Sequence, residues 1–142
     1  MIRPTFRKLS YAVLALALSS TPAFAAETSK LEDVMESMND SYKALKKQVA
    51  DPSKNADSHK LVLTMLETAV QAKKLAPALA GEKQGAEKDK FMVAYQKSMS
   101  DLLVEYVKLE VMVLDGKNAD AEAQLKKIIE MKNAAHKVFQ KE

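Results

Sequence analysis

The sequence predicts an all-α protein that folds as an antiparallel up-down-up-down four-helix bundle. Of the 142 residues, 47% are hydrophobic and 29% are charged, while only three are glycine and four are proline. This composition favours helices over many short strands. From about Ser29 onward, apolar residues recur in steps of three and four, the spacing of one helix face. Turn-forming residues divide this region into four segments, and each apolar face must be buried against its neighbours.

The first helix is expected to follow Ser29 and to end before a polar turn that contains Pro52. Its apolar stripe consists of Leu31, Met35, Met38, Tyr42, Leu45 and Val49. We expect Ser58 to cap the second helix, because serine commonly occupies the first position of a helix. The inner face of that helix carries Val62, Met65, Leu66, Ala69 and Leu75.

A segment from Pro77 to Ala86, which contains two glycines, separates the second helix from the third. The third helix is predicted from about Glu87 to Leu114, with core candidates Phe91, Tyr95, Met99, Leu102, Leu109 and Val113. A short turn at Asp115-Gly116-Lys117-Asn118 leads to a fourth helix from about Ala119 to Lys141. Its inner face presents Ala121, Leu125, Ile128, Ile129, Ala135 and Phe139, with His136 on or beside that face.

Residues 1–25 have the organisation of a cleaved secretory signal. Three basic residues precede an apolar stretch from Tyr11 to Leu18, and Ala23 and Ala25 form the small-x-small pattern of a cleavage site. The apolar stretch is shorter than the roughly 20 residues of a membrane span. We therefore expect residues 26–142 to form one domain in the bacterial periplasm, without membrane insertion.

Charge and cysteine content exclude several classes of protein. The 22 basic residues exceed the 19 acidic ones by three, and the predicted signal contains three basic residues and no acid, so the remaining chain is formally balanced. Its lysines are spread over the helices, which argues against a nucleic-acid partner. The absence of cysteine excludes disulfides, thiolate metal sites and covalent haem attachment. With no nucleophile and base pair and no phosphate-binding loop, we expect no enzymatic activity.

Two potential metal ligands are expected to converge at one end of the bundle. Met35 lies about six residues into the first helix, or roughly 9 Å, and His136 about five residues from the end of the fourth, or roughly 8 Å, at 1.5 Å per residue. In an up-down topology these two helices are neighbours, and the two side chains lie at nearly the same level. The expected remaining lining consists of Ala72, Leu75, Phe91 and Tyr95.

A thioether facing a neutral imidazole across an apolar slot suits low-spin haem iron and, with both axial positions filled, electron transfer. Methionine is also a common core residue, and a histidine near a helix C-terminus can simply complement the helix dipole. Two other interpretations therefore remain at this point. One is a haem-free bundle that binds a protein or peptide partner, and the other is a carrier of copper or another metal that uses Met35, Met38 and His136.

Two runs of residues resemble the soluble cytochrome b562 family. Leu31-Glu32-Asp33-Val34-Met35-Glu36 is similar to the first helix of that family, and Lys132-Asn133-Ala134-Ala135-His136 is similar to its last. The position of Gly116 relative to His136 also fits the family pattern. The resemblance implies one noncovalent b-type haem per chain, with Met35 and His136 as axial iron ligands. It further implies a monomer that exchanges electrons with redox partner proteins in the periplasm.

The chain departs from the family at the expected haem edge. The third helix is about one turn longer, so either Phe91 and Tyr95 or Tyr95 and Met99 correspond to the aromatic residues that pack on the haem. The family often has an arginine near the haem, where this chain offers Lys132, which can pair with a propionate but lacks the planar two-pronged geometry. The acids Glu32, Asp33 and Glu36 form a rim that could orient a partner. The second histidine, His59, is expected on the surface at the opposite end.

Overall fold

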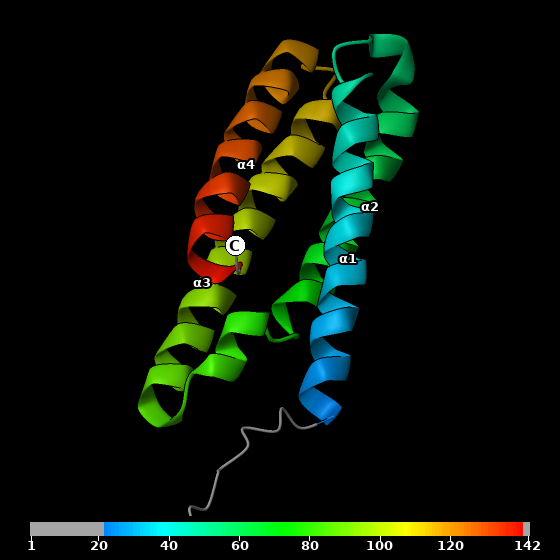
Figure 1. The fold of residues 1–142 in the computed structure, drawn as a ribbon. Coiled ribbons are helices and arrows are strands. Elements are labelled where there is room, and N and C mark those ends of the chain that lie inside the picture. Colours follow the sequence, from blue (N-terminus) through cyan, green and yellow to red (C-terminus); the bar gives the residue numbers. More distant parts are fainter. Residues whose placement is uncertain (1–21, 141–142) are drawn as a thin grey trace, which may run out of the picture.

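The computed structural model describes residues 22–140, and within them the all-α four-helix bundle is confirmed. Figure 1 shows the four helices side by side, with successive helices running in opposite directions. The helices are α1 (Pro22–Lys46), α2 (Asn55–Lys73), α3 (Gly85–Leu114) and α4 (Asn118–Phe139), with short 3-10 helices η1 (Pro52–Lys54) and η2 (Ala78–Glu82) in two of the connections. Of the helix pairs, α1 packs closely on α2, α2 on α3 and α3 on α4, whereas α1 and α4 do not form a close pair.

Most of the predicted signal lies outside the described residues. The first helix α1 begins at Pro22 and so runs through the expected cleavage point after Ala25. The cleavage itself stays a prediction. Within the described residues, no helix is both long enough and apolar enough to cross a membrane.

The connection between α1 and α2 starts the second helix earlier than the sequence predicted. Asp51 Oδ1 accepts hydrogen bonds from the backbone N–H of Ser53 at 2.9 Å and from its hydroxyl at 2.7 Å. This cap and the proline that follows it start the helical conformation at η1, and the chain continues directly into α2. Ser58 is therefore not a cap but a fully buried residue inside α2, where its hydroxyl accepts a bond from Gln48 Nε2 at 3.2 Å.

The turn between α3 and α4 lies at the same end of the bundle as the connection between α1 and α2. Gly116 adopts φ +69°, a left-handed conformation that favours glycine at a helix C-terminus. Asn118, at the start of α4, donates from its Nδ2 to the carbonyl oxygen of Val49 and to Asn55 Oδ1, both at 2.7 Å. These bonds join the two connections, and we call this the closed end of the bundle.

The core is densely packed from the closed end to the middle of the bundle. The largest fully buried apolar side chains are Leu45, Val49, Val62, Met65, Leu109, Val113 and Ile128. Tyr106, which the apolar pattern did not identify, is also buried. In α4 every buried residue lies between Asn118 and Ile128, and all residues from Ile129 to Phe139 are partly or fully exposed. The second half of α4 is thus less well packed, and we call that end the open end.

Candidate functional site

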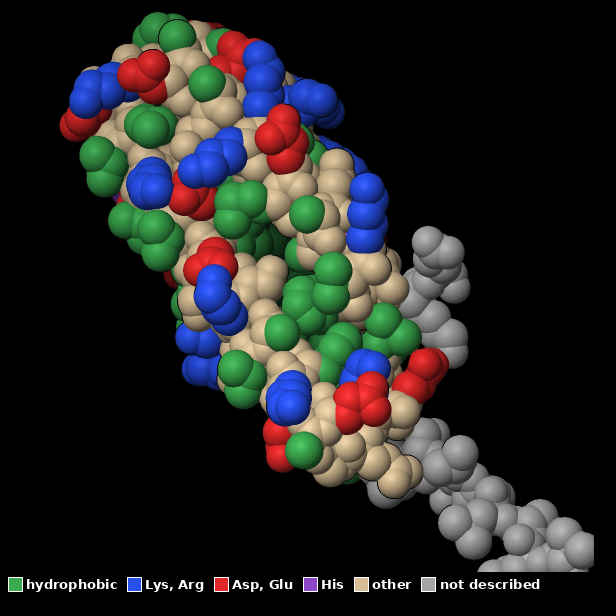
Figure 2. Space-filling model, turned by 90° about the vertical axis from the view of Figure 1, so that its left-hand side faces the viewer, with side chains coloured by type: hydrophobic (Ala, Val, Ile, Leu, Met, Phe, Trp, Pro, Cys, Tyr) green, Lys and Arg blue, Asp and Glu red, His purple; other side chains and the backbone are tan. Residues whose placement is uncertain are grey.

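Two cavities adjoin each other at the open end, with volumes of about 300 and 390 Å³. Their walls come mainly from α1, α3 and α4, and most of the lining side chains are apolar. Five residues line both cavities: Met35, Ser98, Met99, Ala135 and His136. Figure 2 views the face that is on the left in Figure 1 and shows a hollow in it with hydrophobic side chains inside. Together the cavities form a slot that passes between α1 and α4.

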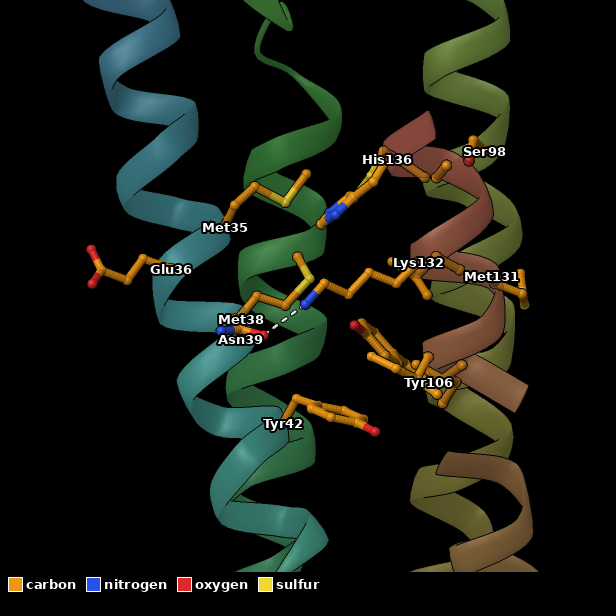
Figure 3. A pocket seen from close by; sticks show the side chains of 15 residues that line it. Met35, Glu36, Met38, Asn39, Tyr42, Ser98, Tyr106, Met131, Lys132 and His136 are labelled. Atoms are coloured by element: carbon orange, nitrogen blue, oxygen red, sulfur yellow. Dashed lines mark hydrogen bonds between the residues drawn. The ribbon is translucent and has the colours of Figure 1, made fainter. Parts of the chain in front are cut away.

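Met35 and His136 stand on opposite sides of this slot. Met35 comes from α1 and His136 from α4, and Figure 3 shows their side chains pointing toward one another. They lie at nearly the same level in Figure 3, but the predicted distances from the helix ends were wrong, because α1 begins at Pro22 and α4 ends at Phe139. Burial lowers the pKa of the His136 imidazole, and the ammonium of Lys132 lowers it further. The ring is therefore neutral at neutral pH, with a lone pair available to a metal.

A polar contact crosses the slot one turn deeper in the bundle. The Lys132 ammonium on α4 donates a hydrogen bond of 2.6 Å to Asn39 Oδ1 on α1 (Figure 3). Burial lowers the pKa of Lys132, with a smaller effect of the Lys43 charge. Asn39 was not predicted as a site residue. Its spacing of four residues from Met35, matched by Lys132 four residues before His136, is the signal that could have identified it.

Tyrosines fix the inner wall of the slot. Tyr42 from α1 and Tyr106 from α3 line the first cavity below Lys132 (Figure 3). Tyr95 lines the second cavity and donates a hydrogen bond of 2.8 Å to the carbonyl oxygen of Ala72. Burial raises the pKa of Tyr95 to about 12, so its hydroxyl stays protonated. Ala72 was expected in the lining, but it is fully buried beneath Tyr95, and neither it nor Leu75 contributes to these two cavities.

The geometry agrees with a comparison to known protein families. The family model of cytochrome b562 matches residues 30–140, which include nearly all of the described helices. The chain belongs to the cytochrome b562 family. Membership implies a four-helix bundle that binds a b-type haem and carries electrons, rather than a classical enzyme. No curated protein matches the chain significantly.

The donor set of the slot fits the haem of this family. A thioether and an imidazole are neutral ligands for haem iron, and an apolar lining suits the body of a porphyrin. Within the described residues, no three His, Cys, Asp or Glu side chains gather as a metal site.

The resemblance left open whether Phe91 and Tyr95 or Tyr95 and Met99 pack against the haem. In the structure, Tyr95 and Met99 line the cavities. Phe91 is not among the residues that line either cavity. Instead its ring packs edge-on against Phe139, with 5.4 Å between the ring centroids, and the Lys83 ammonium lies 5.2 Å from its centroid. Phe139 also packs edge-on against Tyr95 at 5.5 Å and lines the second cavity. Phe91 therefore supports the wall from behind, and Phe139 is a lining residue that was assigned only to the core.

Apart from Lys132, the charged residues at the slot are acids at its mouth. Glu36 lines the first cavity and Glu32 the second, and both are exposed, as is Asp33. On the face in Figure 2, acidic and basic side chains alternate without forming a patch of one sign. His59 lies far from the slot, and its Nε2 is 2.9 Å from Glu110 Oε1, so it is a partly buried partner between α2 and α3 rather than a free surface residue.

Proposed function

We propose that this chain is a periplasmic electron-transfer protein in which Met35 and His136 bind the iron of one noncovalent b-type haem. The observation that carries the proposal is that a thioether from α1 and an imidazole from α4 share the common wall of both cavities. Bound there, haem supplies a one-electron couple between ferrous and ferric iron. With Met35 and His136 both as ligands, the iron would have no open position for oxygen or a substrate, which favours electron transfer over catalysis.

The two proposed ligands contribute differently to the reduction potential. The Met35 thioether would stabilise ferrous iron and so would raise the potential. His136 binds only as a neutral imidazole, a form that its partly buried position favours. The apolar lining would exclude water and so would disfavour ferric haem, which carries one more positive charge than ferrous haem. Because the chain has no cysteine, the haem would have no covalent attachment to the protein and would be held by Met35, His136, the apolar lining and polar contacts such as that of Lys132.

Residues around the slot would position the group. Tyr95, held by its hydrogen bond to Ala72, and Met99 offer apolar surfaces to the ring. Lys132 is the cation at the slot and is a suitable partner for a propionate, which would replace its bond to Asn39. The two propionates of a haem are anionic, so a partly buried ammonium gains more from such a pair than an exposed one does.

The chain would exchange electrons with partner proteins as a monomer. The acidic rim formed by Glu32, Asp33 and Glu36 would orient a basic surface of a redox partner toward the mouth of the slot. The predicted signal at residues 1–25 and the family membership support a periplasmic location.

Haem reconstitution followed by visible spectroscopy tests the proposal. The wild-type protein should bind one haem and give the sharp reduced-minus-oxidised bands of a low-spin iron. Met35→Ala and His136→Ala should each lose the low-spin signal, whereas Met112→Ala, which alters a methionine outside both cavities, should retain it. If His136→Ala binds haem with an unchanged spectrum, or if the wild type takes up no haem, the proposed ligation is wrong.

A further inference from the structure

Soft ligand atoms gather around the slot in greater number than a haem requires. The sequence has eight methionines, of which Met1 lies outside the described residues. Four of the remaining seven line the first cavity together with His136, namely Met35, Met38, Met99 and Met131. Only two of these methionines, Met35 and Met99, also line the second cavity, and so does His136. A methionine from α1, a methionine from α3 and a histidine from α4 therefore all line both cavities.

This ligand set suits a soft monovalent metal ion. Thioethers and imidazoles favour Cu(I), whereas Mg²⁺, Ca²⁺ and Mn²⁺ prefer carboxylate and carbonyl oxygens. Within residues 22–140, no cluster of three His, Cys, Asp or Glu side chains competes with the sulfur atoms. The ammonium of Lys132, one helical turn from His136, repels a doubly charged ion more strongly than a singly charged one. The surroundings thus discriminate against both hard and divalent ions.

We propose that Met35, Met99 and His136 bind one Cu(I) ion in protein that holds no haem. The proposal does not rest on haem binding. Haem iron and Cu(I) would both use Met35 and His136, so occupation by one excludes the other. The role of Met99 separates the two, because it would ligate copper but only pack against a haem.

Met99 is a better third ligand than Met38, which the sequence alone had suggested. Met38 lines only the first cavity and precedes Asn39, the residue that accepts the hydrogen bond of the Lys132 ammonium. A site built on Met38 would therefore place the ion nearer to a positive charge. Met99 is 5% exposed, lies on α3 and lines both cavities, so it completes a set of ligands from three helices.

Competition with a chromophoric Cu(I) chelator tests the proposal. Purified haem-free protein is titrated without oxygen against Cu(I) bicinchoninate, and we expect it to remove one equivalent of copper. Met99→Leu, which nearly conserves volume, should weaken binding by at least about tenfold, since loss of even an outer residue of a metal site has an effect of that size. The matched control is Met112→Leu on the same helix, which lines neither cavity and should bind as the wild type does.

Two further measurements make the outcome decisive. Circular dichroism should show that Met99→Leu keeps the helicity of the wild type, so that a loss of copper binding cannot be attributed to unfolding. Protein loaded with haem beforehand should take up no Cu(I). Binding of copper to the haem-loaded protein, wild-type affinity in Met99→Leu, or no copper uptake by the wild type would each overturn the proposal. A protein that binds Cu(I) but no haem would support the copper site and refute the haem ligation.

Discussion

The closed and open ends of this bundle are built from the same four helices, yet they differ in how their space is filled. At the closed end, the Asn118 side chain bonds to both Val49 and Asn55, and the core side chains beneath it are fully buried. At the open end, α4 has no buried residue after Ile128, and two cavities separate it from α1. The difference indicates that the closed end stabilises the fold, while the open end leaves room that a haem would fill.

The largest difference between the ends is expected in the unfolding free energy that is lost when one of two leucines of α3, seven residues apart, is replaced by alanine. Leu109 is fully buried near the closed end, and Leu102 lines the first cavity. In haem-free protein, Leu109→Ala should cost about 3 to 4 kcal/mol of unfolding free energy. Leu102→Ala should cost about half as much, because its side chain already lacks neighbours on one side. Urea unfolding monitored by circular dichroism measures both. Equal costs would show that the two ends are packed alike.

Haem binding should stabilise the open end specifically. At a free haem concentration 100-fold above the dissociation constant, a single site adds about 2.7 kcal/mol to the unfolding free energy. Hydrogen exchange measured with and without haem should show the largest gain of protection in residues 129–139 of α4, which lack buried side chains. The hydrogen-exchange rates of amides close to Asn118 should change little, except where those amides exchange only through global unfolding. A gain of amide protection confined to the closed end would contradict the placement of haem at the open end.

A carboxylate network joins α3 to α4 beside Tyr106 and Ile128, which line the first cavity. Glu105 Oε2 accepts hydrogen bonds from Gln124 at 2.7 Å and Lys127 at 2.8 Å, and Oε1 accepts one from Lys108 at 2.8 Å. Replacement of this charged acceptor by Glu105→Gln should cost about 1 to 2 kcal/mol. The matched control Glu122→Gln alters an exposed pair on α4 with Lys126 and should cost under about 0.5 kcal/mol.

The same network gives a stability that depends on pH. Hydrogen bonds, led by that from Lys108, lower the pKa of Glu105 to about 2 from an ordinary value of 4.5. Because the folded state holds the proton less tightly, the stabilisation is complete above pH 4.5 and is lost as the pH falls through about 2. Chemical unfolding of the wild type between pH 2 and pH 5 should show this decline, and Glu105→Gln should show a shallower one. Parallel curves would contradict the assignment.

The smallest effect is expected from the bond between Lys132 and Asn39. Asn39→Ala removes the acceptor of a partly exposed contact, so the haem-free protein should lose under about 1 kcal/mol. The haem association rate measured by stopped-flow absorbance should rise or stay constant, because the contact that joins α1 to α4 across the slot is gone. A clearly slower association would show that Asn39 assists haem binding instead.

Periodicity predicted most of the fold, since apolar residues at helical spacing specify four amphipathic helices. It also predicted that Met35 and His136 share a level, as Figure 3 shows, although the helix ends on which that estimate rested were wrong, because α1 begins at Pro22. Periodicity missed Glu105 and Tyr106, because a search for apolar stripes passes over side chains that carry a polar group and are nevertheless buried. The contact between Lys132 and Asn39 joins residues 93 positions apart, so it follows from the sequence only once Met35 and His136, each four residues from one of them, are paired across the slot.

The choice between Phe91 and Met99 could not be made from the sequence for a different reason. Both residues lie on the same face of α3 as Tyr95, and their distance from the slot depends on where α4 ends. In the structure α4 ends at Phe139, whose ring packs against Phe91 and covers it. The lining of the slot is thus set by tertiary contacts between two helices rather than by the pattern within one.

Proton NMR of the reduced, haem-loaded protein with ¹³C-labelled methionine methyl groups tests the central claim most directly. The ring current of a porphyrin shifts the methyl resonance of an axial methionine far upfield. The account predicts one such resonance, which disappears in Met35→Leu and persists in Met38→Leu and Met99→Leu. A spectrum without a far-upfield methyl, or one that loses it in Met99→Leu instead, would contradict the assignment of Met35 as the sulfur ligand.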